Sequence, residues 1–381
     1  MVQRERHEFI ERHRAVLAHS FLDDRFQHAI TMPHRFDSQQ HNLRWATSFF
    51  FFAPGVRLAF IVTSIFNMKT IKLGQSDLTG TRIAYGCWRI AGTQEPAEVS
   101  EERGNNAAKA VMAAYEAGFT TFDLADVYCN GTVETIFGQV LKQVPEMRGK
   151  ITIVSKGGIR AKGQPAANSA YRYDFSAEYI VQACEQSLER LGIETIDLYL
   201  LHRPDFLADW AEVGATFEKL HQAGKVRSFG VSNFTTQQVE LLQANCPFPL
   251  VTNQIEFSLA KIDAISDGTL GQCQLNKMTP MAWSPLAAGR LASSGPIDMK
   301  SPDHAKRQKV RDTLDDIARA RGTARSVIAL AWLLRHPAGI LPVIGTTNPE
   351  RIAELAKADE TELSRDEWYR LMEAANGQRL P

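Results

Sequence analysis

The sequence predicts an α/β fold, namely a closed (β/α)8 TIM barrel with a short N-terminal hairpin and additional C-terminal helices. After Met68, short runs rich in β-branched residues alternate with longer amphipathic runs, which is the pattern of parallel strands joined by crossover helices. Eight strand-helix units follow one another in this way. Periodicity alone does not distinguish a barrel from an open doubly wound sheet, but eight units favour the barrel.

The boundaries of the elements follow from the apolar period and from helix stop signals. The predicted strands cover residues 82–87, 120–124, 151–155, 196–201, 228–232, 251–255, 278–283 and 341–344. The predicted helices between them cover residues 105–117, 132–142, 177–191, 211–223, 236–244 and 326–336. Gly118, Gly192 and Gly224 end three of these helices, because glycine readily adopts the left-handed conformation that closes a helix.

Further segments exceed a minimal barrel. Residues 303–321 and 350–358, with a tail helix at 364–375, have helical periodicity and are predicted to decorate the barrel. Residues 70–73 and 81–84 form a short alternating pair, which we expect to be a hairpin that closes the bottom of the barrel.

The first 67 residues differ from the rest. Residues 1–45 carry four arginines in the first fourteen positions and no sustained apolar period, which indicates a poorly ordered segment. Residues 46–66 are apolar, but Pro54 and Arg57 near their middle make a poor spanning helix. We expect residues 1–67 to be an extension outside the fold or a stretch upstream of a true start at Met68, with a membrane anchor as the alternative. Residues 68–381 then form the barrel domain.

Charge and cysteine content exclude several classes of function. The 43 Lys and Arg residues balance 43 Asp and Glu residues, so no global field attracts nucleic acid or anionic lipid. The five cysteines are dispersed and include no CxxC pair, which indicates neither a disulfide framework nor a cysteine-rich zinc site. We therefore expect a cytoplasmic protein without a metal site, a nucleic-acid partner or a membrane partner. The oligomeric state stays open.

Four ionisable residues fall at the ends of predicted strands, where barrel enzymes carry their active groups: Asp123, Tyr128, Lys156 and His202. Each alone could be a loop cap, a solvated strand end or a core histidine. Together they suit general acid catalysis at a carbonyl, because a tyrosine needs a nearby cation to stabilise its phenolate and a buried lysine needs a carboxylate to stay charged. His202 then orients the substrate oxygen or shares the proton.

A resemblance to the aldo-keto reductase family covers about residues 69–376. It is carried, in matching order and spacing, by FDLADVY, VSKGG, DLYLLHRPD, GKVRSFGVSNF and TNQIEFS. The resemblance implies Tyr128 as proton donor, Lys156 and Asp123 as the groups that tune it, and His202 as the residue that positions the carbonyl. The likeness is greatest to a bacterial branch of oxidoreductases in which these motifs do not specify the substrate.

The same resemblance implies NADPH (NADP+) as cofactor, held without a GxGxxG fingerprint. It places Ser232, Asn233 and Gln254 at the nicotinamide carboxamide, Trp283 against the ring, Ser284, Leu286, Gly289 and Arg290 at the pyrophosphate, Thr346, Asn348 and Arg351 around the 2'-phosphate, and Glu354 at the adenine. Trp283 is a departure, because many members have tyrosine there. Gly345 is another, because many members have lysine there, and the NADPH preference then depends on Arg351.

The predicted function is NADPH-dependent reduction of a small aldehyde or ketone to an alcohol. The alternative is a cofactor-binding regulatory subunit of the same fold with little turnover. A metal-dependent barrel hydrolase or isomerase would need clustered metal ligands at strand ends, and only His202 fits that requirement.

The rim of the substrate pocket is predicted from the loops. Residues 160–173, together with Trp88, Arg89 and Tyr171, are expected to shape it. Arg203 either contacts a polar group or bridges to a carboxylate.

Overall fold

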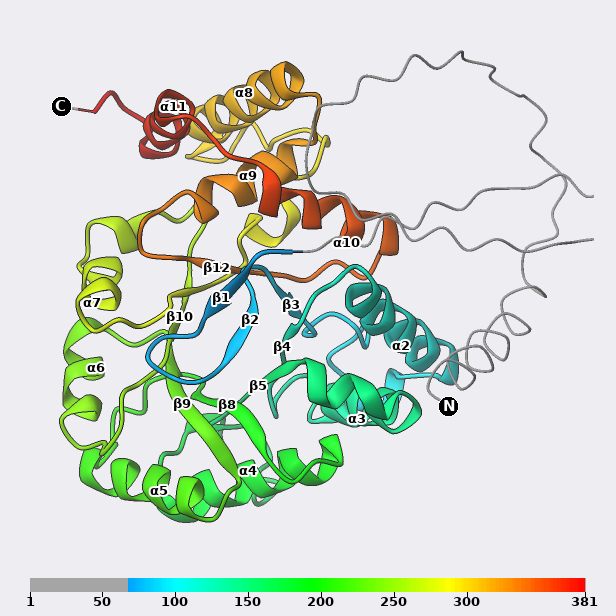
Figure 1. Ribbon diagram of the computed structural model, residues 1–381, viewed down its shortest axis with the longest axis vertical. Coiled ribbons are helices and arrows are strands. Elements are labelled where there is room, and N and C mark those ends of the chain that lie inside the picture. Colours follow the sequence, from blue (N-terminus) through cyan, green and yellow to red (C-terminus); the bar gives the residue numbers. More distant parts are fainter. Residues whose placement is uncertain (1–67, 381) are drawn as a thin grey trace, which may run out of the picture. The chain divides into compact units, whose positions relative to one another are not determined.

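Eight parallel strands close into a barrel in the computed structural model, which describes residues 68–380 (Figure 1). The strands are β3 (Ala84–Gly86), β4 (Thr121–Asp123), β5 (Thr152–Gly157), β8 (Ile196–Leu201), β9 (Val226–Ser232), β10 (Asn253–Glu256), β11 (Met281–Trp283) and β12 (Leu341–Ile344). Around the barrel the order is β10-β11-β12-β3-β4-β5-β8-β9. The predicted barrel is confirmed, with strand ends shifted by a few residues. The predictions for residues 1–67 fall outside the described residues.

Helices alternate with the strands and cover the outside of the barrel (Figure 1). They are α2 (Glu101–Glu116), α3 (Thr132–Gln143), α4 (Ala177–Leu191), α5 (Trp210–Gln222), α6 (Thr236–Gln243), α7 (Thr269–Leu275), α9 (Arg325–Leu334) and α10 (Pro349–Ala356). Two additional helices, α8 (His304–Arg321) and α11 (Arg365–Asn376), pack against each other. The additional C-terminal helices are therefore confirmed.

One helix prediction needs correction, and one helix was not predicted. The segment predicted at 350–358 as decoration is α10, the helix that follows β12 and packs between α2 and α9, so it completes the barrel. Helix α7 was not predicted, because its seven residues are too short and too polar to show an apolar period.

Side-chain caps explain where several helices begin. Ser100 accepts a hydrogen bond from the backbone of Arg103, so α2 starts four residues before the predicted residue 105. Ser364 and Glu367 form a reciprocal capping box at the start of α11. At the end of α4, Gly192 adopts a left-handed φ of 65°, as the stop signal predicts.

A two-stranded hairpin lies at the amino-terminal end of the barrel. Strands β1 (Thr70–Lys72) and β2 (Thr79–Thr81) pair antiparallel, with Thr70 opposite Thr81. The hairpin is confirmed, but its second strand ends where the predicted one, residues 81–84, begins. The reason is that Ala84 already belongs to β3 and pairs with β12.

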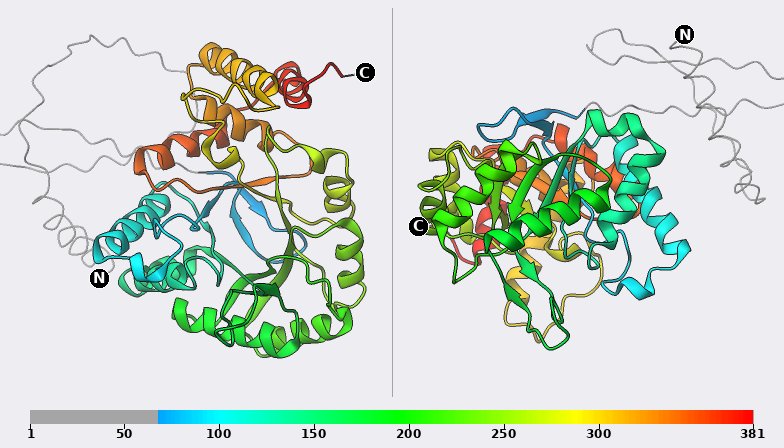
Figure 2. Two further views of the ribbon diagram at one scale, coloured as in Figure 1. Left: turned by 180° about the vertical axis from the view of Figure 1, so that it is seen from behind. Right: turned by 90° about the horizontal axis from the view of Figure 1, so that it is seen from below.

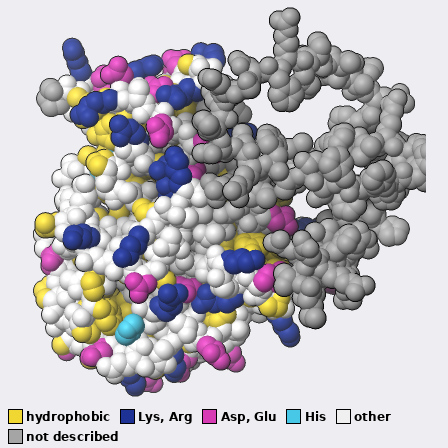
Figure 3. Space-filling view, viewed as in Figure 1, with side chains coloured by type: hydrophobic (Ala, Val, Ile, Leu, Met, Phe, Trp, Pro, Cys, Tyr) yellow, Lys and Arg dark blue, Asp and Glu magenta, His cyan; other side chains and the backbone are white. Residues whose placement is uncertain are grey.

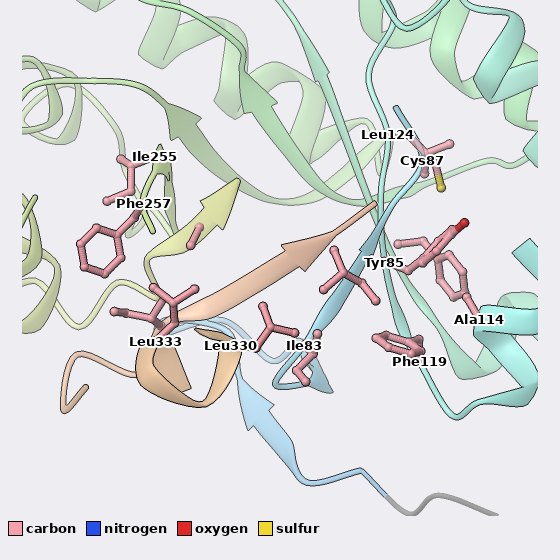
Figure 4. Close-up of a cluster of buried hydrophobic side chains, with 14 of the residues drawn as sticks. Ile83, Tyr85, Cys87, Ala114, Phe119, Leu124, Ile255, Phe257, Leu330 and Leu333 are labelled. Atoms are coloured by element: carbon pink, nitrogen blue, oxygen red, sulfur yellow. The ribbon is translucent and has the colours of Figure 1, made fainter. Parts of the chain in front are cut away.

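Two apolar clusters flank the strands. Within the barrel, Leu198 and Leu200 of β8 join Leu73 and Leu78 of the hairpin loop, which fill the lower end of the interior. Tyr199, between the two leucines, belongs to the outer cluster between strands and helices. Part of that outer cluster is drawn in Figure 4, where Ile83, just before β3, and Tyr85 of β3 are labelled.

The opposite end of the barrel carries long loops. The short strands β6 (Ile159–Arg160) and β7 (Arg172–Tyr173) form an antiparallel hairpin after β5. In the right view of Figure 2 this green hairpin and the yellow loop before α8 project from one end, and the blue hairpin of β1 and β2 lies at the other. These loops surround the cavity described below.

The described surface has the mixed character that the composition predicts. On the face shown in Figure 3, basic and acidic side chains are interspersed over the barrel. Among the helices of residues 68–380, none combines the length and the apolarity that crossing a membrane requires.

Candidate active site

The carboxyl ends of the barrel strands surround a cavity of about 1220 Å³. Pockets for drug-sized ligands usually measure about 300–1,000 Å³, so this cavity has room for more than a small carbonyl compound. Most of the predicted site residues line it: Asp123, Tyr128, His202, Ser232, Asn233, Gln254, Trp283, Ser284, Leu286, Gly289, Arg290, Gly345, Thr346, Arg351 and Glu354. Lys156 lies buried beneath its floor, and Asn348 is not part of the lining.

Lys156 is the centre of a buried polar cluster. Its Nζ lies 2.8 and 2.9 Å from the two carboxylate oxygens of Asp123, 2.7 Å from the carbonyl of Leu124 and 2.9 Å from Oη of Tyr128. The lysine side chain is fully buried and that of Asp123 is 5% exposed. The ammonium therefore uses its three donors on one carboxylate, one carbonyl and one phenol.

The strands explain this geometry. Asp123 ends β4, and Lys156 lies within β5, which extends two residues beyond the predicted end at 155. The two strands are adjacent and parallel, with Asp123 opposite Val154. Tyr128 is carried by the loop after β4, whose backbone turns through Cys129 and Asn130 with φ of 46° and 48°.

The pKa of Tyr128 lies above its ordinary value, although a lysine ammonium is beside it. Burial raises the pKa of Tyr128 to about 12, although the Lys156 charge lowers it. Desolvation therefore outweighs the cation, and the phenol is protonated at neutral pH. Burial lowers the pKa of Lys156, but Asp123 and Tyr128 together more than offset this, so the net shift is upward and the ammonium stays charged.

His202 faces the phenol across the cavity. Its ring lies edge-on to Tyr128 with 5.8 Å between the ring centres, and its backbone N–H donates to the carbonyl of Gly157. Burial, Lys156 and Arg203 hold the pKa of His202 well below its usual value, so the imidazole is neutral. Its Nδ1 is buried and has no partner among residues 68–380. The four predicted catalytic residues thus surround one cavity.

A hydrogen-bonded chain links the residues assigned to the nicotinamide. Trp283 Nε1 donates to Asn233 Oδ1 at 2.9 Å, and Asn233 Nδ2 donates to Ser232 Oγ at 2.7 Å. Gln254 Nε2 donates to Asp123 Oδ1 at 2.7 Å, so this amide contacts the lysine-carboxylate pair directly. Sequence reasoning did not foresee that link, because it joins β10 to β4 across the barrel.

The loop after β11 has an unusual backbone. Ser284, Ala287 and Ala288 have φ of 54°, 51° and 58°, and Gly289 has φ of 90°. Glycine is favoured at the last position because a side chain is strained at that φ, even though nothing lies within 4 Å of a Cβ there. The loop brings Arg290 to the cavity wall.

Two of the predicted residues have local roles after β12. Asn348 accepts a hydrogen bond from the backbone of Arg351 at 2.9 Å and caps α10, which explains its absence from the lining. Thr346 accepts a hydrogen bond from Tyr85 through its backbone carbonyl.

Arg290 and Arg351 form no ion pair with any residue in 68–380, so both cations are available to a ligand.

The structure adds residues that sequence reasoning missed. Arg325 and Ser326, at the start of α9, line the cavity. Arg325 holds Asp315 with two hydrogen bonds of 2.7 and 2.8 Å, so its charge is already paired. Their only sequence signal was a basic and a hydroxyl residue opening a helix. The predicted rim residues Trp88, Arg89, Tyr171 and Arg203 also line the cavity.

A parallel barrel whose strand ends gather a phenol, an ammonium, a carboxylate and a neutral imidazole around a large cavity has the design of a barrel oxidoreductase. Comparison with known proteins agrees. Residues 82–376 match the Aldo/keto reductase family. The chain is 40% identical over 317 residues to a 6-dehydroglucose reductase of Novosphingobium aromaticivorans, covering 81% of this chain and 96% of that one.

Two further relatives point the same way. Oxidoreductase YdhF of Escherichia coli is 40% identical over 268 residues, covering 70% of this chain and 86% of that protein. A crystal structure of an aldo/keto reductase from Klebsiella pneumoniae in complex with NADP and acetate superposes with a TM-score of 0.63 at 28% identity, covering 80% of this chain and 94% of that one. The chain belongs to the aldo-keto reductase family and is an NAD(P)H-dependent oxidoreductase.

Proposed function

We propose that the protein reduces an aldehyde or ketone to an alcohol with NADPH, and that Tyr128 is the general acid. The observation that carries this proposal is the Lys156 ammonium, 2.9 Å from the Tyr128 hydroxyl and bound to both oxygens of Asp123. A buried cation in that position stabilises the phenolate that remains when the proton leaves.

The residues present fit a phosphorylated dinucleotide. The cavity is large enough for a cofactor beside a substrate, and the side chains of Arg290 and Arg351 are free to bind phosphate. Ser232, Asn233 and Gln254 would hold the nicotinamide carboxamide, and the Trp283 ring would pack on the nicotinamide. Because Gln254 Nε2 is already bonded to Asp123, its Oε1 is the atom left for the carboxamide.

When bound, the nicotinamide supplies a hydride to the carbonyl carbon. The carbonyl oxygen then gains the electron pair of the C=O π bond and takes the proton from Tyr128. Neutral His202, which faces the phenol, orients that oxygen by a hydrogen bond. The phenolate, held beside Lys156, recovers a proton from solvent, so the residues return to their starting state.

Two considerations support an oxygen-rich aldehyde as the substrate. The relative from Novosphingobium aromaticivorans is named a 6-dehydroglucose reductase, and a 6-dehydro sugar carries an aldehyde. Polar side chains that line the cavity, including those of Gln94 and Arg89, are suited to the hydroxyl groups of such a sugar. We therefore include oxygen-rich aldehydes among the candidate substrates.

The test compares Tyr128→Phe with wild type on a panel of carbonyl compounds, using NADPH and NADH. Tyr115→Phe is the matched control, because Tyr115 lies on α2 away from the cavity. Loss of the proton donor should lower kcat/KM by about 10²–10⁴-fold and leave cofactor affinity nearly unchanged. Equal turnover in Tyr128→Phe and wild type would refute the assignment. Tight NADPH binding by wild type without turnover of any carbonyl would favour a regulatory subunit instead.

A further inference from the structure

Arg203 is a cation of the cavity wall for which residues 68–380 provide no charged partner. It follows His202 directly, is partly buried and lines the cavity. Its guanidinium carbon lies 5.5 Å from the centre of the Trp283 ring. Neither an ion pair nor a side-chain hydrogen bond joins it to the part of the chain that is described. A charge at a partly buried position loses part of its hydration. That cost stays uncompensated unless a group of opposite charge binds to it.

The carboxylates near Arg203 along the chain and in the neighbouring hairpin are engaged elsewhere. Asp205 accepts backbone hydrogen bonds from Phe175 and Leu207, both at 2.9 Å, one on each oxygen. Asp174 is paired with Arg160. Glu256 also lines the cavity, but it is not within ion-pair distance of Arg203. The alternative that Arg203 bridges to a carboxylate of the protein therefore does not hold for the described residues.

The position of Arg203 separates it from the phosphate-binding arginines. Arg203 follows β8, and Arg351 lies in the helix after β12. In the closed order β12-β3-β4-β5-β8, these strands stand four places apart, which is opposite across an eight-stranded barrel. Arg290 follows β11, the neighbour of β12. The Arg203 guanidinium lies beside the Trp283 ring, which is proposed to pack on the nicotinamide, so an anion bound there lies at the nicotinamide end of the cavity, where the carbonyl reacts.

We propose that Arg203 is a specificity-determining residue that binds a carboxylate of the substrate, so that the enzyme favours carbonyl compounds bearing an acidic group over matched neutral ones. This inference rests on the proposed carbonyl reduction. The planar guanidinium matches a carboxylate with two parallel hydrogen bonds. Because Arg203 is adjacent in sequence to His202, the acidic group lies a short spacer away from the reacting carbonyl.

The test uses rigid substrates of known geometry. We would measure kcat/KM with NADPH for 3- and 4-carboxybenzaldehyde and for the two corresponding carbamoylbenzaldehydes, which are neutral and similar in shape. The readout is the carboxylate-to-amide ratio for each ring position. A charge-assisted hydrogen bond should give a ratio of about tenfold to hundredfold for at least one position in wild type. The favoured position then measures the spacing between the carbonyl and Arg203.

Three variants assign the effect. Arg203→Gln should reduce the ratio to near one, and Arg203→Lys should keep part of it because the charge remains. Arg319→Gln should keep the full ratio, because Arg319 is exposed on α8 and does not line the cavity. A wild-type ratio near one at every position, or an unchanged ratio in Arg203→Gln, would overturn the proposal. Turnover of the neutral amides by wild type, and its loss in Tyr128→Phe, reports separately on the proposed function.

Discussion

Replacement of Lys156 by methionine tests the buried cluster most directly. Methionine keeps an unbranched side chain of similar length but removes the ammonium, which leaves Asp123 with Gln254 as its remaining described side-chain partner and the Leu124 carbonyl without the lysine. Removing one member of a buried ion pair typically costs about 3–5 kcal/mol, because the other charge stays buried without compensation. We expect the free energy of unfolding of Lys156→Met to fall by roughly that amount.

Catalysis should fall for a different reason. Without the cation, the pKa of Tyr128 loses the influence that opposes burial, so proton donation becomes harder. We expect kcat/KM to decrease by about 10²–10⁴-fold, as for loss of general acid catalysis. Urea unfolding followed by tryptophan fluorescence gives the stability, and consumption of NADPH with an aldehyde gives the rate.

A double variant separates the two effects. In Lys156→Met with Asp123→Asn the uncompensated carboxylate is gone, so most of the stability should return while the rate stays low. The reasoning is refuted if Lys156→Met is as stable as wild type, or if the double variant regains activity. Either result would mean that the ammonium does not compensate the buried carboxylate or does not assist Tyr128.

Two further predictions follow from the cavity and from the phenol. Gly345→Lys should raise the ratio of kcat/KM for NADPH over NADH by about two- to fivefold, since an exposed ion pair contributes up to about 1 kcal/mol. A side chain fits at this position, because the nearest atom to a Cβ placed there is 3.7 Å away. A ratio equal to that of the Gly345→Ala control would contradict the prediction. Because burial raises the pKa of Tyr128 from 10.0 to about 12, the stability linked to its protonated form is present below pH 10 and is lost as pH rises toward 12. In ultraviolet absorbance titrations, the difference between wild type and Tyr128→Phe should show no phenolate near pH 10, and a phenolate there would be the opposite result.

Much of the fold could be predicted from local signals. The strands are buried apolar runs, and the caps and left-handed glycines that bound the helices are chemical preferences of single residues, as at Ser364 and Gly192. The errors lie where tertiary packing overrides local preference. Residues 350–358 were predicted to be an addition to the barrel. They complete it instead, because the chain leaves β12 beside α2, against which α10 packs.

The candidate site divides in the same way. The residue types at strand ends, Asp123, Tyr128, Lys156 and His202, are a property of the sequence, and a parallel barrel brings such ends together. Only the tertiary structure decided the burial, the charges and the hydrogen-bond partners around these side chains. Burial outweighs the Lys156 charge at Tyr128, Gln254 reaches Asp123 from a strand 131 residues away, and Arg203 is left without a carboxylate. These outcomes depend on desolvation and on distances between separate strands, which no local pattern of residues encodes.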